Sequence, residues 1–226
     1  MPQDSVTSSC IGALFDWDGV VVDSSAQHER SWELLADENG KRLPPDHFLR
    51  GFGMKNQEIV RGLLEWCDDP REIEALSLRK EVLYRQVVQE EGIAPIPGAV
   101  ELLHLLNERG VACAVASSTH RENITSGLEK IGISHLFAAV VSAEDVTVGK
   151  PDPEVFVKCA KAIGREQHRC VVFEDAVVGI QAGQAAGMKV VAVATTNSLD
   201  KLLDANLAVE SLEHVDWPTL ELLFSG

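Results

Sequence analysis

Basic residues are scarce in this 226-residue chain. It has 20 lysines and arginines against 35 aspartates and glutamates, which gives a formal net charge of −15. A surface of this sign repels nucleic acids and anionic membranes, so we expect neither as a partner. An anionic substrate would meet the same long-range repulsion. Its site must therefore be locally positive or hold a metal ion.

Cysteine patterns typical of disulfide frameworks or zinc sites are also lacking. The five cysteines are scattered, odd in number and never spaced as CxxC. This usage fits a reducing cytoplasm. The first nine residues lack a basic start, and no apolar run is long enough to span a bilayer. We therefore expect a soluble cytoplasmic protein, present as a monomer or weak homodimer.

Short apolar runs alternate with amphipathic helical segments over most of the chain, and 45% of the residues are hydrophobic. Runs without polar alternation are typical of strands buried on both faces of a parallel sheet. They cover residues 11–15, 111–116, 138–142, 170–173 and 190–194. Helical segments near 98–109, 121–131, 153–163 and 176–186 are each followed by a glycine, the usual helix stop. The alternation predicts a doubly wound α/β domain.

One interval interrupts this alternation. Residues 24–92 contain no convincing strand, only helical segments at 26–39, 57–66 and 71–91. The chain length suits one core domain with a small insertion. We predict an α/β core formed by residues 1–22 and 95–226, with a helical cap at 23–94 inserted after the first core strand.

Two aspartates follow the first predicted strand, in the run Asp16-Trp17-Asp18-Gly19. Ligands of open parallel sheets bind outside the carboxyl ends of the strands. Residues two apart in extended chain face the same side, so Asp16 and Asp18 would share a pocket. Carboxylates this close repel one another unless a cation or a proton intervenes. Alone, the pattern fits a turn or a calcium-loop fragment equally well.

Three further features lie at other strand ends. The hydroxyls of Ser117 and Ser118 suit a phosphate, although helix capping alone would explain them. Lys150 stands in a proline-rich loop, where the alternative is a solvated surface lysine. Glu174 and Asp175 follow the fourth run and would otherwise complement a helix dipole. Acids at two strand ends, with a lysine and hydroxyls at two others, make one coherent constellation.

The four motifs, in this order and with a helical insertion after the first, resemble those of the haloacid dehalogenase superfamily. The likeness is to its β-phosphoglucomutase and sugar-phosphatase-like members, which have a Rossmann-like core and a helical cap. The resemblance implies that Asp16 attacks phosphorus and becomes an aspartyl-phosphate. It also implies that Asp18 protonates the leaving oxygen and then activates water.

The same resemblance implies the binding groups. Ser117, with the Ser118 backbone, and Lys150 would hold the phosphoryl oxygens. His28 lies where related enzymes often place a histidine near the site, a surface histidine being the alternative. Magnesium, which favours hard oxygen ligands, would bind the Asp16 carboxylate, the Asp18 carbonyl and Asp175, with Glu174 direct or through water.

The chain also departs from the family pattern. Related phosphomutases carry a cap glycine followed closely by an arginine that grips a second phosphate, and residues 51–58 contain no arginine. Lys55 could substitute, but it lacks the bidentate fork. We therefore expect a phosphatase of small phosphorylated metabolites such as sugar phosphates. The alternatives are a sugar phosphomutase and a phosphoacceptor or regulatory binding protein, which the insertion and the acidic pair argue against. Trp17 is bulkier than the usual aliphatic residue, without a functional explanation.

Overall fold

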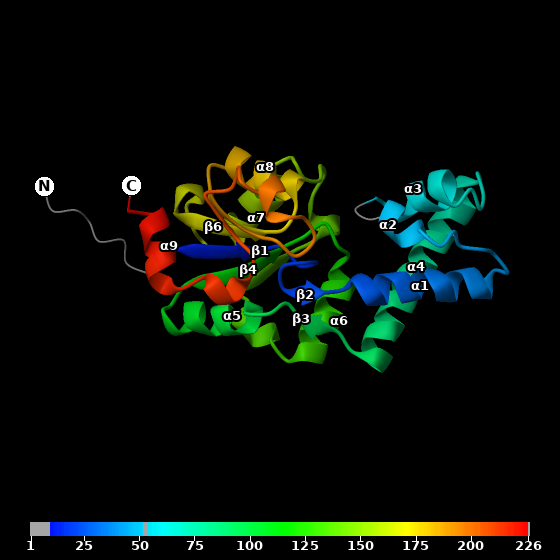
Figure 1. Cartoon of the computed structure of the whole chain (residues 1–226), viewed down its shortest axis with the longest axis horizontal. Coiled ribbons are helices and arrows are strands. Elements are labelled where there is room, and N and C mark those ends of the chain that lie inside the picture. The colour runs from blue at the N-terminus through cyan, green and yellow to red at the C-terminus, as the bar shows by residue number, and fades with distance from the viewer. Residues whose placement is uncertain (1–9, 52–53, 226) are drawn as a thin grey trace, which may run out of the picture. The chain divides into compact units, whose positions relative to one another are not determined.

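The computed structural model describes residues 10–51 and 54–225. It divides into two compact units (Figure 1). One unit takes the chain up to Asp23 and from Ala94 onward, and the other is Ser24–Ile93. Among the described residues, no helix is both long enough and apolar enough to cross a membrane.

The first unit is built on a six-stranded sheet with the order β5-β4-β1-β6-β7-β8 and parallel neighbours throughout. Its strands are β1 (Gly12–Phe15), β4 (Ala112–Ala116), β5 (Ala139–Val141), β6 (Cys170–Glu174), β7 (Lys189–Val193) and β8 (Leu207–Val209). All five predicted strands are present, with ends that differ by at most one residue. The half-buried edge strand β8 was not predicted.

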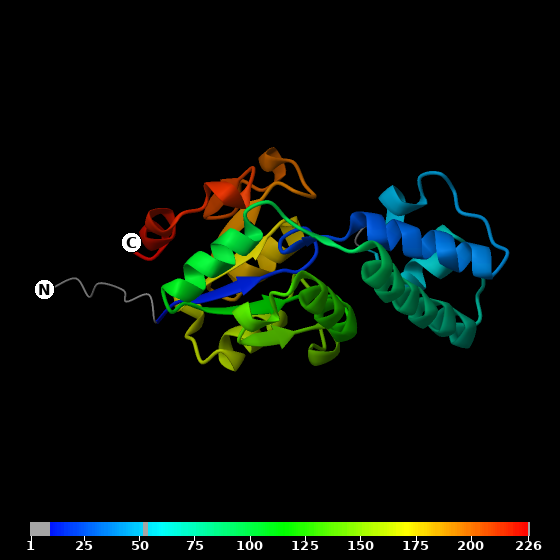
Figure 2. The same ribbon diagram turned by 90° about the horizontal axis from the view of Figure 1, so that it is seen from below.

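Helices cover both faces of this sheet. Helices α5 (Ala99–Glu108) and α6 (Arg121–Ile131) lie on one face, toward the viewer in Figure 2. Helices α7 (Glu154–Ala162) and α8 (Val177–Ala185) lie on the other, and α9 (Trp217–Leu223) is the last helix. The prediction of a doubly wound α/β fold is confirmed. The strand order reverses around β1, and this is where such folds bind ligands.

Strand β1 lies in the middle of the sheet, and both of its faces are buried. Leu14 packs with Phe156 and Ile180 on the side of α7 and α8. On the opposite face, the ring of Phe15 stacks on that of Phe173, with centroids 4.4 Å apart. An uninterrupted apolar run is what a strand buried on both faces requires.

The second unit is helical. It contains α1 (Ser25–Glu38), α2 (His47–Gly51), α3 (Asn56–Glu58), a π-helical turn (Ile59–Leu63) and α4 (Pro70–Glu91). Helices α1 and α4 pack against each other, and Trp32 meets Trp66 edge to face at 6.3 Å in the apolar centre. Helix α4 begins sharply, because the Asp69 carboxylate accepts hydrogen bonds from the backbone N–H groups of Arg71 and Glu72. The described part of residues 24–93 contains no strand.

A short ribbon marks the point where the chain leaves the α/β unit and returns. Strands β2 (Val22–Asp23) and β3 (Ala94–Pro95) pair antiparallel, with Asp23 opposite Ala94. The backbone N–H of Ile96 extends the contact by donating to the Val21 carbonyl at 3.0 Å. The outgoing and incoming segments therefore run side by side.

The bulk of Trp17 has a packing explanation. Its side chain is fully buried, and its ring lies against Gly127 of α6, where an added Cβ would stand 2.5 Å from the Trp17 Cζ2 atom. Gly127 thus makes room for the indole. This contact anchors the segment that carries Asp16 and Asp18.

We expect Gly127→Ala to lower the free energy of unfolding by about 1–3 kcal/mol through overpacking against the indole. In a Trp17→Leu background the clash is absent. The same substitution should then be neutral or stabilising by up to about 1 kcal/mol, because alanine favours helix. Urea unfolding of the four proteins of this cycle measures both effects. An equal loss in the two backgrounds would contradict the packing explanation.

Candidate active site

Asp16 is the first residue beyond β1. Its backbone N–H still bonds to β6, donating to the Phe173 carbonyl at 3.0 Å. This bond fixes the residue at the carboxyl end of the central strand, between β4 and β6. The side chains of Asp16 and Asp18 are both partly buried.

The turn after Asp18 depends on a glycine. Gly19 has φ of +77°, and its N–H donates to the Val22 carbonyl at 2.8 Å. A Cβ at Gly19 would lie 2.1 Å from the Asp175 Oδ2 atom. Glycine is therefore required both for the left-handed backbone and for the close approach of that carboxylate.

Lys150 enters the site from the loop before α7. Its Nζ atom lies 3.0 Å from Asp16 Oδ1 and 2.5 Å from Glu174 Oε1, with 7% of its side chain exposed. The loop is held at its base by Glu154, whose Oε2 accepts from the N–H groups of Thr147 and Val148. The structure thus brings Lys150 to the end of the sheet, and its burial excludes a solvated surface lysine.

The acidic pair ends β6. Glu174 is fully buried, and its Oε2 accepts hydrogen bonds of 3.0 Å from the backbone N–H groups of Asp175 and Ala176. Gly179 of α8 leaves space for this carboxylate, because an added Cβ would stand 1.9 Å from the Glu174 Cδ atom. Asp175 itself is only 4% exposed.

Asp16, Glu174 and Asp175 each offer an oxygen, and these atoms lie within 4.8 Å of one another. With Lys150 as the counter-ion, the ionised cluster keeps two uncompensated negative charges in a buried place. Uncompensated buried charge is costly, so a divalent cation fits this donor set. Carboxylate oxygens are the ligands that magnesium prefers.

Burial changes the titration of this cluster. It raises the pKa of Asp16 to about 7, against the opposing effect of the Lys150 ammonium. Burial also raises the pKa of Asp175 to about 8, with added repulsion from Glu174 and Asp16. Burial would lower the pKa of Lys150, but the two carboxylates beside it outweigh this and raise it above its usual value. The lysine therefore stays positive.

The hydroxyl run after β4 reaches Asp18. Ser117 is buried, and its Oγ accepts from the Thr119 N–H at 3.1 Å. The Thr119 hydroxyl donates to Asp18 Oδ2 at 2.5 Å. Ser118, which stands between Ser117 and Thr119 in the sequence, is exposed. Thr119 was not singled out from the sequence. The sequence shows Thr119 next to Ser117 and Ser118. It does not show which of the three hydroxyls bonds to Asp18.

His28 and Lys55 belong to the helical unit. The His28 ring stacks on Tyr84 at 4.2 Å, and its Nδ1 lies 2.6 Å from the Nζ of Lys80, which is 2% exposed. Glu81 joins this cluster by accepting from Lys80 at 3.2 Å. Lys55 is exposed before α3. Lys80 and Glu81 were not recognised, because charged residues in a long amphipathic helix are typical of a solvated face.

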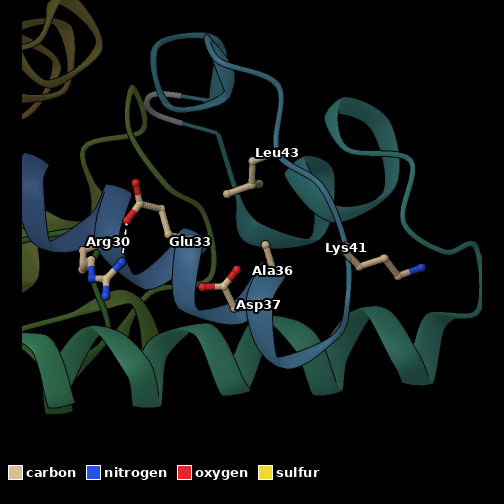
Figure 3. A pocket seen from close by; sticks show the side chains of 6 residues that line it. All are labelled: Arg30, Glu33, Ala36, Asp37, Lys41 and Leu43. Atoms are coloured by element: carbon tan, nitrogen blue, oxygen red, sulfur yellow. Dashed lines mark hydrogen bonds and ion pairs between the residues drawn. The ribbon is translucent and has the colours of Figure 1, made fainter.

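Part of the stretch that lacks an arginine, Phe52 and Gly53, lies outside the described residues. The helical unit also has a hollow of about 270 Å³ (Figure 3). It is lined by Arg30, Glu33, Ala36, Asp37, Lys41 and Leu43. The candidate catalytic residues and the hydroxyl run do not line this hollow.

Comparison with known proteins gives a consistent result. The haloacid dehalogenase-like hydrolase family matches residues 13–193. The chain is 32% identical to the chloroplastic 5-amino-6-(5-phospho-D-ribitylamino)uracil phosphatase of Arabidopsis thaliana, over 94% of this chain and 57% of that protein. It is also 32% identical to hexitol phosphatase A of Escherichia coli, over 91% of this chain and 93% of the relative.

The fold is also shared with a solved structure, that of β-phosphoglucomutase from Clostridium difficile. The TM-score is 0.79 at 25% identity, covering 94% of this chain and 96% of the other. The resemblance seen in the four sequence motifs is thereby confirmed. This chain belongs to the haloacid dehalogenase-like hydrolase family and is an enzyme of its phosphomonoester hydrolase type.

Proposed function

We propose that the protein is a magnesium-dependent phosphatase of small phosphorylated metabolites, with sugar phosphates as its substrate class and Asp16 as its nucleophile. The observation that carries this proposal is the buried Lys150, which contacts both Asp16 and Glu174 beside Asp175. A nucleophile, a fixed cation and a set of metal ligands thus meet at one end of the sheet. The similarity to a hexitol phosphatase supports the substrate class.

In the first step, a carboxylate oxygen of Asp16 forms a bond to phosphorus while the bond to the leaving oxygen breaks. The Lys150 ammonium offsets the negative charge that the phosphoryl group brings to the carboxylate. Asp18 donates its proton to the leaving oxygen, so that the product departs as an alcohol.

In the second step, water attacks the phosphorus of the aspartyl-phosphate. Asp18, now ionised, accepts a proton from this water, and the bond between Asp16 and phosphorus breaks. Inorganic phosphate leaves and the Asp16 carboxylate is restored. The hydroxyl bond from Thr119 supports this role, since it holds the Asp18 side chain beside the phosphate-binding residues.

The groups that hold the phosphoryl oxygens would be Lys150, the Ser117 hydroxyl and the backbone N–H of Ser118. Magnesium would be held by the carboxylates of Asp16 and Asp175 and the Asp18 carbonyl, with Glu174 direct or through water. When bound, it supplies positive charge to the phosphoryl oxygens.

We further propose that the helical unit acts as a cap. The paired strands β2 and β3 are suited to be its hinge, with Asp23 and Ser24 at the boundary. Closure of such a cap excludes water during phosphoryl transfer. His28 and Lys55 are its proposed substrate contacts, and the buried Lys80, which is ion-paired with Glu81, lies beside His28. We expect a cytoplasmic monomer or weak homodimer.

A phosphatase is favoured over a phosphomutase by the chemistry of the cap. A mutase must hold a bisphosphate intermediate while this intermediate reorients in the site. This requires strong binding of the second phosphate. Lys55 presents a point charge without the bidentate geometry of arginine. Water should therefore compete successfully, and free phosphate should accumulate.

We expect Asp16→Asn to abolish phosphatase turnover, because the amide keeps the shape but is not a nucleophile. Asp18→Asn should be slower by roughly 10²–10⁴-fold, the usual contribution of general acid–base catalysis. Asp200→Asn, an exposed residue of the same unit, is the matched control and should be unaffected. Phosphate release from p-nitrophenyl phosphate and circular dichroism measure rate and folding. Normal turnover by a folded Asp16→Asn protein would place the nucleophile elsewhere.

We expect EDTA to silence the enzyme, Mg²⁺ to restore it and Ca²⁺ to inhibit it through its larger, looser coordination shell. Asp175→Ala should raise the Mg²⁺ concentration for half-maximal rate. Because Asp16 and Asp175 keep their protons up to about pH 7 and 8 without the ion, Mg²⁺ must displace protons. Its apparent affinity should therefore rise from pH 6 to pH 8.5. Full activity in chelator would refute the metal requirement.

Hydrolase and mutase can be separated with one substrate. With β-glucose 1-phosphate, we expect free phosphate to exceed glucose 6-phosphate, with or without a bisphosphate primer. The cap variant Lys55→Ala should weaken substrate binding without creating mutase activity. Isomerised product that outruns phosphate release would instead assign the enzyme to the mutases.

A further inference from the structure

Three consecutive side chains after β7 are bonded to the proposed metal-binding end of the sheet. The Thr195 hydroxyl donates to the Gly19 carbonyl at 2.5 Å. Thr196 makes a side-chain hydrogen bond with the Asp175 carboxylate. The Asn197 Nδ2 donates to the Asp175 carbonyl at 3.0 Å. All three bonds end on residues that follow β1 or β6.

The topology of the sheet explains how the loop after β7 reaches both the turn after β1 and the end of β6. β7 is the neighbour of β6, with Ala192 opposite Glu174, and β6 is the neighbour of β1. The Thr195 N–H donates to the Val193 carbonyl at 3.0 Å and closes a three-residue turn at the end of β7. The Ala194 N–H donates to β8, at the Val209 carbonyl, at 2.9 Å. The backbone of the loop is therefore fixed before its side chains reach across β6.

The contacts converge on one crowded point. A Cβ at Gly19 would meet Asp175 Oδ2 at 2.1 Å and Thr196 Oγ1 at 2.8 Å. The turn after the nucleophile, the Asp175 carboxylate and the Thr196 hydroxyl thus occupy adjoining positions. The loop after β7 thus does more than connect strands, because its Thr196 hydroxyl bonds to the buried carboxylate of Asp175.

We propose that the segment Thr195-Thr196-Asn197 positions the Asp175 carboxylate and the Gly19 turn for a divalent cation, with Thr196 as the principal positioning residue. The inference rests on the proposed magnesium-dependent function. A carboxylate held by a hydroxyl and by its own backbone loses less conformational freedom when it binds a metal. Outer partners of metal ligands typically contribute 10–100-fold to metal affinity.

Mg²⁺ binding to the full-length protein tests this proposal without reference to turnover. Isothermal titration with MgCl₂, together with the Mg²⁺-dependent rise of Tm, is measured for wild type, Thr196→Val, Thr196→Ser and Asn197→Ala. Thr219→Val is the matched control, because the Thr219 hydroxyl also donates to an aspartate, Asp216, but at the start of α9. Melting in EDTA reports whether each variant is folded.

We expect Thr196→Val to weaken Mg²⁺ binding about 10–100-fold, the range for outer partners of metal ligands. Thr196→Ser should keep nearly the wild-type affinity, since it retains the hydroxyl. Asn197→Ala should weaken binding in the same direction, and it serves in place of Thr196→Val if that variant does not fold. Thr219→Val should bind as the wild type does.

Two kinds of failure are distinguishable. If the wild type binds Mg²⁺ and folded Thr196→Val binds it equally well, the positioning role is overturned while the proposed function stands. Equal weakening in Thr196→Ser or in Thr219→Val would also overturn it, because the loss would not follow the hydroxyl at this position. If the wild type itself does not bind Mg²⁺, the proposed function fails and this inference fails with it.

Discussion

The ion pairs of Lys150 are the interaction on which the active end of the sheet depends. Asp16 and Glu174 belong to a group of carboxylates gathered within 4.8 Å, in a place where water is largely excluded. The buried ammonium between them offsets their mutual repulsion and opposes the rise in the pKa of Asp16 that burial causes. The same lysine offsets only part of the local negative charge, so in a chain of net charge −15 an anionic substrate also needs the proposed divalent cation.

Close packing then fixes the carboxylates around this lysine. Gly19 and Gly179 stand where any side chain would overlap Asp175 or Glu174. Backbone N–H groups and Lys150 hold Glu174, and the Thr196 hydroxyl bonds to Asp175. Trp17 contributes from the opposite side, since its burial against α6 anchors the segment that carries the two aspartates. Rigid surroundings of this kind preorganise a site before any ligand arrives.

Much of this arrangement could be predicted from local sequence. Uninterrupted apolar runs identify the buried strands, and polar residues directly after them fall at the same edge of a parallel sheet. Asp16, Lys150 and Glu174 were found in this way. Thr119 and Thr196 were not recognised as partners of the acids, because their significance lies in contacts with residues distant in the sequence. Strand β8 was not predicted for another reason. A three-residue, half-buried edge strand has too little periodicity to be distinguished from a loop.

The antiparallel ribbon of β2 and β3 allows the inserted segment to be replaced during evolution. Asp23 and Ala94 are directly opposite each other, so the ends of the inserted segment are as close as the two sides of a hairpin. A turn of about two residues suffices to join strands in this relation. The insertion is therefore modular: a shorter, longer or unrelated segment could replace it without altering the register of a single strand in the six-stranded sheet. Substrate preference and phosphoryl chemistry can then diversify separately, each in its own part of the chain.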